Sequence, residues 1–407
     1  MTAPTDSAVL LPDPEPRPRL HTIVSVDDHL IEPPDLFGGR LPERFVAEAP
    51  RVIEDPDGTQ AWLYEGNRYP NVGLNAVVGR VKEQWSMEPA RFDEMRPGCY
   101  DIHARIRDMD LAGIWASLCF PSLIAGFSGT VFSKSNDLEL GFACMRAWND
   151  WHLEVWAGTY PERIIPLQIP WLADPVLAAE EIRRNAERGF KAVSFPELPA
   201  HAKVGSLHSG VWDSFLAACT ETNTVVCLHT GSGQWAPIPA PDTPFETITT
   251  LFPANALVAT ADWLWSGVPV RFPDLRVALS EGGIGWVPML ADRADYVLAH
   301  SASGHEGGAW KGDLLPSEVL RRNFRFCSID DPSMLALRDR IGVENIMVES
   351  DYPHADSSWP DTQYVVDRVM RGIPQDEVDM MTHLNAAQLF RHPLPEGAWK
   401  ETACSTS

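Results

Sequence analysis

The chain has 407 residues, of which 33 are basic and 56 acidic, so its formal net charge is −23. A negative surplus of this size repels the phosphate backbone of nucleic acids and anionic membrane surfaces, so neither is an expected partner. Apolar residues make up 44% of the chain and charged residues 22%, which is ordinary for a protein that buries a large core. A small molecule is the expected ligand.

The cysteines and the N-terminal residues indicate where the protein works. The seven cysteines form no C-x-x-C pair, and three of them lie in apolar, strand-like runs, which is typical of buried thiols in a reducing compartment. Residues 1–21 are rich in proline and acidic side chains and contain no leader pattern, and no apolar run reaches the length of a membrane span. We therefore expect a cytoplasmic protein in which residues 1–21 form a disordered tail.

The first regular element is predicted at residues 23–32, a β-branched, apolar run that ends in acidic residues and a histidine. Residues 33–100 are rich in proline, glycine and charge without sustained periodicity, and they are predicted to form an irregular, cap-like insertion. A short helix is then predicted at 104–112, stopped by Gly113 before a strand at 114–120.

The rest of the chain alternates between strand-like and helical segments. Further strands are predicted at 164–169, 192–195, 224–229, 275–280, 324–329 and 346–350. Helical spacing lies between or after them, at 137–156, 175–187, 211–222, 254–265, 285–299, 332–340 and 363–370.

Eight strand-then-helix units predict an α/β fold, a closed (β/α)8 TIM barrel with a long insertion after its first strand. An open doubly wound sheet would need a glycine-rich phosphate loop after that strand, and none is present. We expect residues 22–393 to form one metal-dependent barrel domain and residues 394–407 to form a loose tail.

Candidate metal ligands stand where the predicted strands end, and catalytic groups of such barrels lie at the C-terminal ends of the strands. Successive strand side chains point to opposite faces, so Asp27 and His29 leave the first strand on the same side. Strand five ends at His229 and strand eight at Asp351. These four side chains could bind one divalent cation and leave a position for water or substrate.

Each of these residues also has a simpler explanation. His229 precedes T-G-S-G and could be a turn residue bonded to the backbone, and Asp351 in S-D-Y-P-H could start a loop. Glu281, at the end of strand six, could cap the following helix, and His354 could be a surface turn residue. The coincidence of ligand-type residues at four strand ends favours the metal site.

Four segments carry a resemblance to a known family: S-V-D-D-H-L-I-E-P-P at 25–34, L-H-T-G-S-G at 228–233, L-S-E-G-G-I-G-W-V-P at 279–288 and E-S-D-Y-P-H at 349–354. The chain resembles, over residues 22–390, the amidohydrolase-related branch that contains 2-amino-3-carboxymuconate semialdehyde decarboxylase and gamma-resorcylate decarboxylase. The resemblance implies a metal-dependent barrel enzyme whose ligands fall on Asp27, His29, His229 and Asp351.

The chain departs from the pattern of its relatives in two places. Many relatives have H-x-H on the first strand, whereas D-D-H is closer to the E-E-H of the resorcylate branch, and a carboxylate ligand shifts the preference from zinc toward manganese. Relatives also place at the end of strand six a histidine thought to act on the metal-bound water, where this chain has Glu281. Glu281 could act as a base or be structural.

The number of ions follows from Lys191. Binuclear members of the wider superfamily bridge two ions with a carbamylated strand lysine. Lys191 precedes strand four and so lies at the N-terminal end of the barrel, away from the ligands. We therefore expect a single ion, zinc or manganese.

Weaker patterns concern the substrate and the assembly. Trp235, Trp286 and His354 are placed to line a substrate pocket. Arg105 and Arg293 could pair with a substrate carboxylate, although positions on helix surfaces are favoured. The aromatic segment 261–265 could pack against a second copy, so a homodimer is expected.

Two reactions fit such a site, with Glu281 or Asp351 handling the proton. The first is hydrolysis of a small carboxylate-bearing or aromatic substrate by metal-activated water, and it is the leading hypothesis. The alternative is non-oxidative decarboxylation of an aromatic or muconate-type acid. A catalytically silent barrel that binds a metabolite is the hypothesis from another class.

Overall fold

Parallel strands close into a barrel in the computed structural model, which describes residues 10–85, 89–304, 308–396 and 399. The strand order is β6-β5-β1-β12-β11-β10-β9-β8-β7. β6 (Ile164–Ile165) and β7 (Leu167–Gln168), at the two ends of this order, are separated in the chain only by Pro166. Proline has no N–H to donate, so β6 and β7 are one interrupted strand and the nine strands occupy eight positions. The predicted (β/α)8 barrel is confirmed.

The other barrel strands match the predicted runs to within a few residues. They are β1 (Val24–His29), β5 (Ala116–Phe120), β8 (Ala192–Phe195), β9 (Val225–His229), β10 (Val277–Ser280), β11 (Phe324–Ser328) and β12 (Ile346–Val348).

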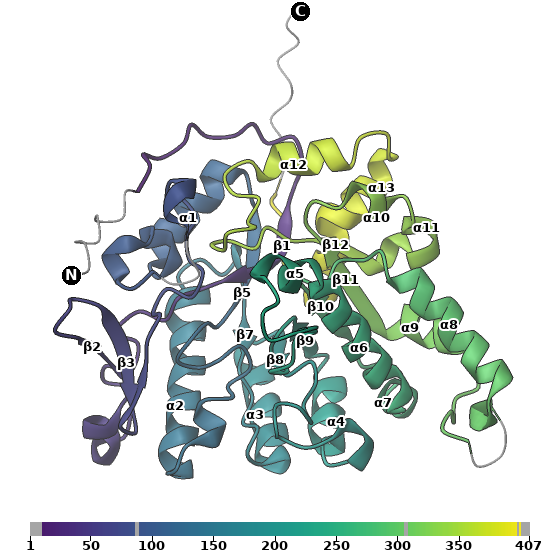
Figure 1. The fold of residues 1–407 in the computed structure, drawn as a ribbon, viewed down its shortest axis with the longest axis horizontal. Helices are drawn as coiled ribbons and strands as arrows, with labels where there is room; N and C mark the ends of the chain where they lie inside the picture. Colours follow the sequence, from purple (N-terminus) through teal and green to yellow (C-terminus); the bar gives the residue numbers. More distant parts are fainter. Residues whose placement is uncertain (1–9, 86–88, 305–307, 397–398, 400–407) are drawn as a thin grey trace, which may run out of the picture.

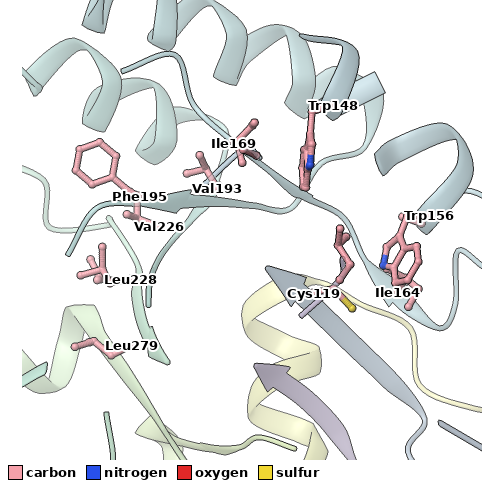
Figure 2. Packing of buried hydrophobic residues seen from close by; sticks show 14 of the residues in the cluster. Cys119, Trp148, Trp156, Ile164, Ile169, Val193, Phe195, Val226, Leu228 and Leu279 are labelled. Carbon is pink, nitrogen blue, oxygen red and sulfur yellow. The ribbon is translucent and has the colours of Figure 1, made fainter. Parts of the chain in front are cut away.

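Alternation along these strands builds two apolar layers. Val193 and Phe195 point outward to the helices, together with Val226 and Leu228 of the next strand (Figure 2). Their neighbours in the chain, such as Cys227, pack inside the barrel with residues of the other strands. Because both faces are covered, most positions of these strands are apolar.

Helices surround the sheet (Figure 1). The longer ones are α1 (Ile102–Ala112), α2 (Leu138–Trp151), α3 (Pro175–Arg188), α4 (Asp213–Glu221), α6 (Phe252–Trp265), α8 (Val287–His300), α9 (Pro316–Asn323) and α12 (Thr362–Val369). Shorter ones are α5 (Phe245–Thr250), α7 (Val268–Arg271), α10 (Pro332–Leu335), α11 (Arg338–Ile341), α13 (Gln375–Asp379) and α14 (Asn385–Phe390).

Local sequence explains where several helices begin and end. Asp137 and Asp174 cap the N-termini of α2 and α3 with their carboxylates, and Gly113 and Gly189 end α1 and α3 in the left-handed conformation. The helix predicted at 332–340 is two short helices instead. Within the described residues, no helix has the length and apolar character needed to cross a membrane.

Part of the insertion is more regular than its sequence predicts. β2 (Arg51–Glu54), β3 (Gln60–Tyr64) and β4 (Asn67–Tyr69) form an antiparallel sheet, so the expectation of an irregular cap is wrong here. The following loop returns to the barrel, where the N–H groups of Val77 and Val78 both donate to the Pro353 carbonyl at 3.1 Å. The insertion therefore reaches the C-terminal ends of the strands.

The described part of the predicted N-terminal tail packs on the barrel, which corrects the expectation of disorder for residues 10–21. The Leu11 N–H donates to the Gly79 carbonyl at 2.7 Å, and the Arg17 guanidinium donates to Asp361 at 2.7 Å. This purple segment runs past α1 toward α12 in Figure 1. Residues 1–9 lie outside the described residues.

The C-terminal segment also contacts the barrel where it is described. Trp399 packs edge-on against Trp115, with ring centroids 5.0 Å apart, and Arg19 lies over the Trp399 ring. Residues 397–398 and 400–407 of the predicted loose tail, including Cys404, lie outside the described residues. The six described cysteines are buried and free, as predicted.

The aromatic end of α6 packs within its own chain. Trp263 is buried and donates its indole N–H to the Glu197 carbonyl at 3.0 Å, and Trp265 contacts Trp310. The pattern from which a homodimer was predicted is thus explained without a second copy, and the homodimer stays a prediction.

Candidate active site

The end of β1 divides its polar side chains between two environments. Asp27 and His29 point to the same side, into the barrel mouth, and both are fully buried. Asp28 points away from them, where its carboxylate accepts hydrogen bonds from the Ser117 hydroxyl and from the Tyr352 N–H. Asp28 therefore anchors the loop that follows β12, while its two neighbours face the site.

His29 meets His229, the last residue of β9, in the barrel mouth. Their Nε2 atoms lie 3.0 Å apart. The Nδ1 atom of His229 lies 2.7 Å from the Thr230 carbonyl, to which only a protonated nitrogen can donate. In the neutral ring the Nε2 atom then carries a lone pair and no proton. The backbone contact of His229, which the sequence left open as an alternative to metal binding, therefore fixes the tautomer that a metal ligand needs.

The loop after β12 brings Asp351 and His354 to the same place. The Asp351 N–H donates to the Asp27 carbonyl at 2.9 Å, and its Oδ1 atom lies 3.5 Å from His29 Nε2. His354 is buried, and its ring centroid lies 3.9 Å from that of His29. Its Nδ1 atom is 3.0 Å from Asp351 Oδ1 without hydrogen-bond geometry.

These residues form two overlapping groups of possible metal ligands. Asp27, His29 and His229 make one, and His29, Asp351 and His354 make the other, each with ligand atoms within 4.8 Å of one another. Both carboxylate oxygens of Asp27 and of Asp351 are buried without a hydrogen-bond partner in the part of the chain that the structure describes. Buried, unpartnered carboxylates beside imidazole nitrogens fit a divalent cation, because its charge would compensate them.

The ionisation of these side chains reflects the same environment. Burial raises the pKa of Asp27 and of Asp351 well above the usual value, and neighbouring carboxylates add to the shift. Burial lowers the pKa of His29 and takes that of His229 to about 3. The histidines are therefore neutral, which is the state that binds metal.

Glu281 stands at the edge of the cluster, directly after β10. Its Oε2 atom lies 3.6 Å from His229 Nε2, and its backbone has a φ of 57°, an uncommon conformation for a non-glycine residue. Burial raises the pKa of its carboxyl well above the usual value, and Asp356 and Glu349 add to the shift. α8 begins only at Val287, so Glu281 does not cap that helix.

Two acidic residues near the site had no role in the sequence-based hypothesis. Glu349 is buried beside Asp27 and Cys327, and its carboxylate accepts the Glu281 N–H at 3.1 Å, which holds the strained backbone there. Asp356 is exposed and groups with Glu281, Asp351 and His354. Glu349 was visible as a carboxylate inside the strand-eight motif, but Asp356 lies in a loop whose path no local pattern predicts.

A cavity of about 390 Å³ opens over the cluster. The Phe127 ring stacks on that of His229 with centroids 4.7 Å apart, and Leu74 and Asn75 of the insertion form part of the wall. The other lining residues are His229, Thr230, Gly231, Thr249, Phe252, Glu281, His354, Ala355 and Asp356. Phe127 and the insertion residues could not be assigned from sequence, because they lie in loops.

Of the three predicted pocket residues, only His354 lines this cavity. Trp286 is buried against Phe326 and donates its indole N–H to the Gly282 carbonyl, so it belongs to the core. Trp235 lies near His201, outside the lining. Both tryptophan predictions are therefore corrected.

The remaining basic candidates lie away from this cavity. Arg105 is not a surface residue: it is buried, and its guanidinium donates to the Gly98 and His29 carbonyls. Arg293 is exposed on α8, as favoured. Lys191 precedes β8 at the N-terminal end of the barrel, as predicted.

Comparison with known proteins decides the family. A family model described as Amidohydrolase matches residues 130–392, which is more than half of the chain. The chain belongs to the amidohydrolase family. This confirms the resemblance drawn from the motifs and identifies the protein as an enzyme, which argues against a silent binding barrel.

Solved structures share the fold of this amidohydrolase. An amidohydrolase of Mycobacterium avium subsp. paratuberculosis is 21% identical with a TM-score of 0.68, covering 91% of this chain and 99% of its own. The 5-carboxyvanillate decarboxylase of Sphingomonas paucimobilis is 22% identical with a TM-score of 0.59, covering 75% and 88%. A dihydroxybenzoic acid decarboxylase of a Polaromonas species, solved with manganese and the inhibitor 2-nitroresorcinol, is 15% identical with a TM-score of 0.61, covering 91% and 97%.

Proposed function

We propose that this amidohydrolase is a metal-dependent, non-oxidative decarboxylase of a small aromatic or unsaturated carboxylic acid. The observation that carries the proposal is the apolar cavity that opens directly onto buried imidazoles and carboxylates. Phe127, stacked on His229, and Phe252 provide flat apolar walls for a planar substrate. The fold shared with carboxyvanillate and dihydroxybenzoic acid decarboxylases supports this reaction over hydrolysis, which the sequence alone had placed first.

We further propose that Asp27, His29, His229 and Asp351 hold one divalent ion, and that this ion is manganese. A carboxylate on the first strand is a hard ligand, which suits manganese better than zinc. The two Nε2 atoms lie 3.0 Å apart, close enough for both nitrogens to hold the same ion. When bound, the ion supplies positive charge that orients an anionic substrate.

In the proposed reaction the bond between the ring carbon and its carboxylate breaks, and carbon dioxide leaves. The bonding electron pair stays on the carbon, which must then take a proton. Glu281 is the proposed donor, since its carboxyl lines the cavity and its buried, acidic surroundings favour the protonated form. Asp351 is the alternative donor. The apolar walls keep bulk water from the carbon, and solvent restores the proton afterwards.

Hydrolysis remains the second candidate function because of the position of Glu281. Its carboxylate, 3.6 Å from His229 Nε2, lies where a general base could take a proton from a water molecule. In that case the enzyme would cleave esters, amides or ring-opened diketo acids and would release no carbon dioxide.

A substrate panel separates the two reactions. Protein loaded with manganese is incubated with hydroxybenzoates and muconate-type acids, and carbon dioxide release is measured beside hydrolysis of esters and amides. The proposal predicts carbon dioxide release from at least one acid, with deuterium at the vacated carbon when the reaction runs in D₂O. Cleavage of esters or amides with no carbon dioxide from any acid would overturn it.

A further inference from the structure

Another cavity lies at the N-terminal ends of the strands, away from the candidate metal ligands. Its volume is about 470 Å³. Val225 begins β9, Arg276 directly precedes β10 and Arg325 lies at the start of β11, and all three residues line this cavity. His229 and Glu281 stand at the other ends of β9 and β10, so the length of the strands separates this cavity from the reaction cavity.

Basic side chains from separate segments gather at this N-terminal cavity. Arg276, Arg325 and Arg391 line it, and Lys191 and Arg322 lie close enough to influence them. Burial and the neighbouring Arg276 lower the pKa of Arg325 to about 10, and the same two causes lower the pKa of Arg322. Like charges are thus held together in a chain whose net charge is −23, which is unfavourable unless an anion compensates them.

The nearby carboxylates do not neutralise these basic groups. Glu344 lines the cavity, but its Oε1 atom accepts a hydrogen bond from Arg321 Nε at 2.8 Å. Asp274 is exposed, and the two carboxylates only partly oppose the lowered pKa values of the arginines. Within the described parts of the chain, none of the five basic side chains forms an ion pair, whereas surface arginines such as Arg340 do.

Each lining guanidinium is held by one nitrogen and keeps its other donors free. In Arg276, Arg325 and Arg391 only the Nη1 atom donates to backbone carbonyls, at distances from 2.7 to 3.4 Å. The Nε and Nη2 atoms have no hydrogen-bond partner among the described residues, and those of the half-buried Arg276 and Arg325 keep accessible surface. The backbone contacts therefore hold the side chains in place while the remaining donors stay open to a ligand.

Guanidinium groups from different segments suit a tetrahedral oxyanion with more than one charge. A carboxylate presents two oxygens in one plane, which a single guanidinium can engage, whereas a phosphate group presents oxygens in several directions. We propose that Arg276, Arg325 and Arg391 bind a small molecule that carries phosphate groups, at a site separate from the reaction cavity. The cavity volume lies in the range of small-molecule sites. This site does not depend on the proposed decarboxylation.

Isothermal titration calorimetry with inorganic pyrophosphate as the probe tests the site. Titrations run at pH 8 and at constant ionic strength, with malonate as the dicarboxylate for comparison. The wild type is expected to bind pyrophosphate about 10-fold or more tightly than malonate. Arg276→Met and Arg391→Met should each weaken pyrophosphate binding by about 10-fold or more, because each removes charge-assisted hydrogen bonds. Adenosine 5′-diphosphate is a second probe, and binding tighter than that of pyrophosphate would assign the site to a nucleotide.

Two control variants locate the bound anion. Arg107→Met removes an exposed arginine of α1 and should keep the wild-type affinity. His229→Ala lacks one candidate metal ligand and should also keep it, which distinguishes this site from a metal ion in the reaction cavity. Thermal unfolding checks that the variants fold. Because Arg391 is exposed, Arg391→Met keeps the test valid if Arg276→Met loses stability.

Three results would overturn the proposal. The first is that the wild type binds pyrophosphate no more tightly than malonate. The second is that a folded Arg276→Met or Arg391→Met variant keeps the wild-type affinity, and the third is that His229→Ala loses it. None of these results bears on carbon dioxide release in the substrate panel, so this proposal and the proposed function fail separately.

Discussion

The Nε2 atoms of His29 and His229 lie 3.0 Å apart although the two residues are 200 positions apart in the chain. The Thr230 carbonyl fixes the tautomer of His229, so its Nε2 atom is an acceptor in the neutral ring. Without a cation, His29 must carry a proton on its own Nε2 atom in order to donate a hydrogen bond to His229 Nε2. With a cation, both lone pairs can bind the same ion.

This geometry predicts that His229→Ala removes metal from the protein. Loss of one ligand should weaken divalent-ion affinity by about 100-fold or more, since even the loss of outer-shell partners costs 10 to 100-fold. Metal content is measured by mass spectrometry after dialysis against a chelator and reloading with manganese. His208→Ala is the control, because His208 is exposed and pairs with Asp262 on the outer surface. Wild-type metal content in His229→Ala would exclude this ligand set.

Glu281→Gln should separate proton transfer from metal binding. The amide preserves the shape of the side chain but has no acidic proton, so kcat for the acid identified in the substrate panel should fall by about 10² to 10⁴. Metal content should stay near that of the wild type. If the variant loses its metal instead, Glu281 is a ligand and the proton comes from another group. An unchanged kcat would remove Glu281 from the reaction.

Arg105 holds the backbone of the metal-ligand strand, so its loss is expected to lower the free energy of unfolding. Its guanidinium donates to the Gly98 and His29 carbonyls and lies near the buried Asp28 carboxylate. Arg105→Met should lower the free energy of unfolding by about 3 kcal/mol or more, because it leaves buried acceptors unpaired. Arg107→Met on the same helix is the matched control, since Arg107 is exposed. Urea denaturation of both variants measures the difference, and equal losses would contradict the structural role.

His152 predicts an acid sensitivity that is independent of the site. It is fully buried against Trp148, and neither ring nitrogen has a hydrogen-bond partner among the described residues. Burial lowers its pKa to about 3. Between the unfolded pKa of about 6.5 and this value, the unfolded chain binds one more proton, so stability falls as pH falls. The slope from this residue is about 1.4 kcal/mol per pH unit, and it vanishes above about pH 6.5.

The test of this acid sensitivity is His152→Phe, which keeps the aromatic packing. Denaturant unfolding at pH values from 9 to 4 should show a shallower loss of stability in the variant than in the wild type below about pH 6.5, with a constant difference at pH 7 and above. Parallel curves over the whole range would show that His152 does not contribute to the slope.

Much of the barrel could be predicted from sequence because most strand positions are apolar on both faces. The run at 192–195 has the same bounds in the structure, where all four of its residues, Ser194 included, are buried. The insertion was harder to predict. β2, β3 and β4 are short and partly exposed, and they are held by pairing with one another, so no periodic pattern marks them.

The sequence by itself determined the barrel, the family and the residue types at the strand ends. Each of these depends on a short stretch of chain: an apolar strand, a helical spacing or a motif at the end of a strand. Only the tertiary structure decided which of those residues meet. It places His354 and Glu281 at the cavity, whereas Trp235 and Trp286 lie outside the lining. Most of the residues whose positions could not be predicted lie in loops. The path of a loop depends on contacts with distant segments, which no local sequence pattern encodes.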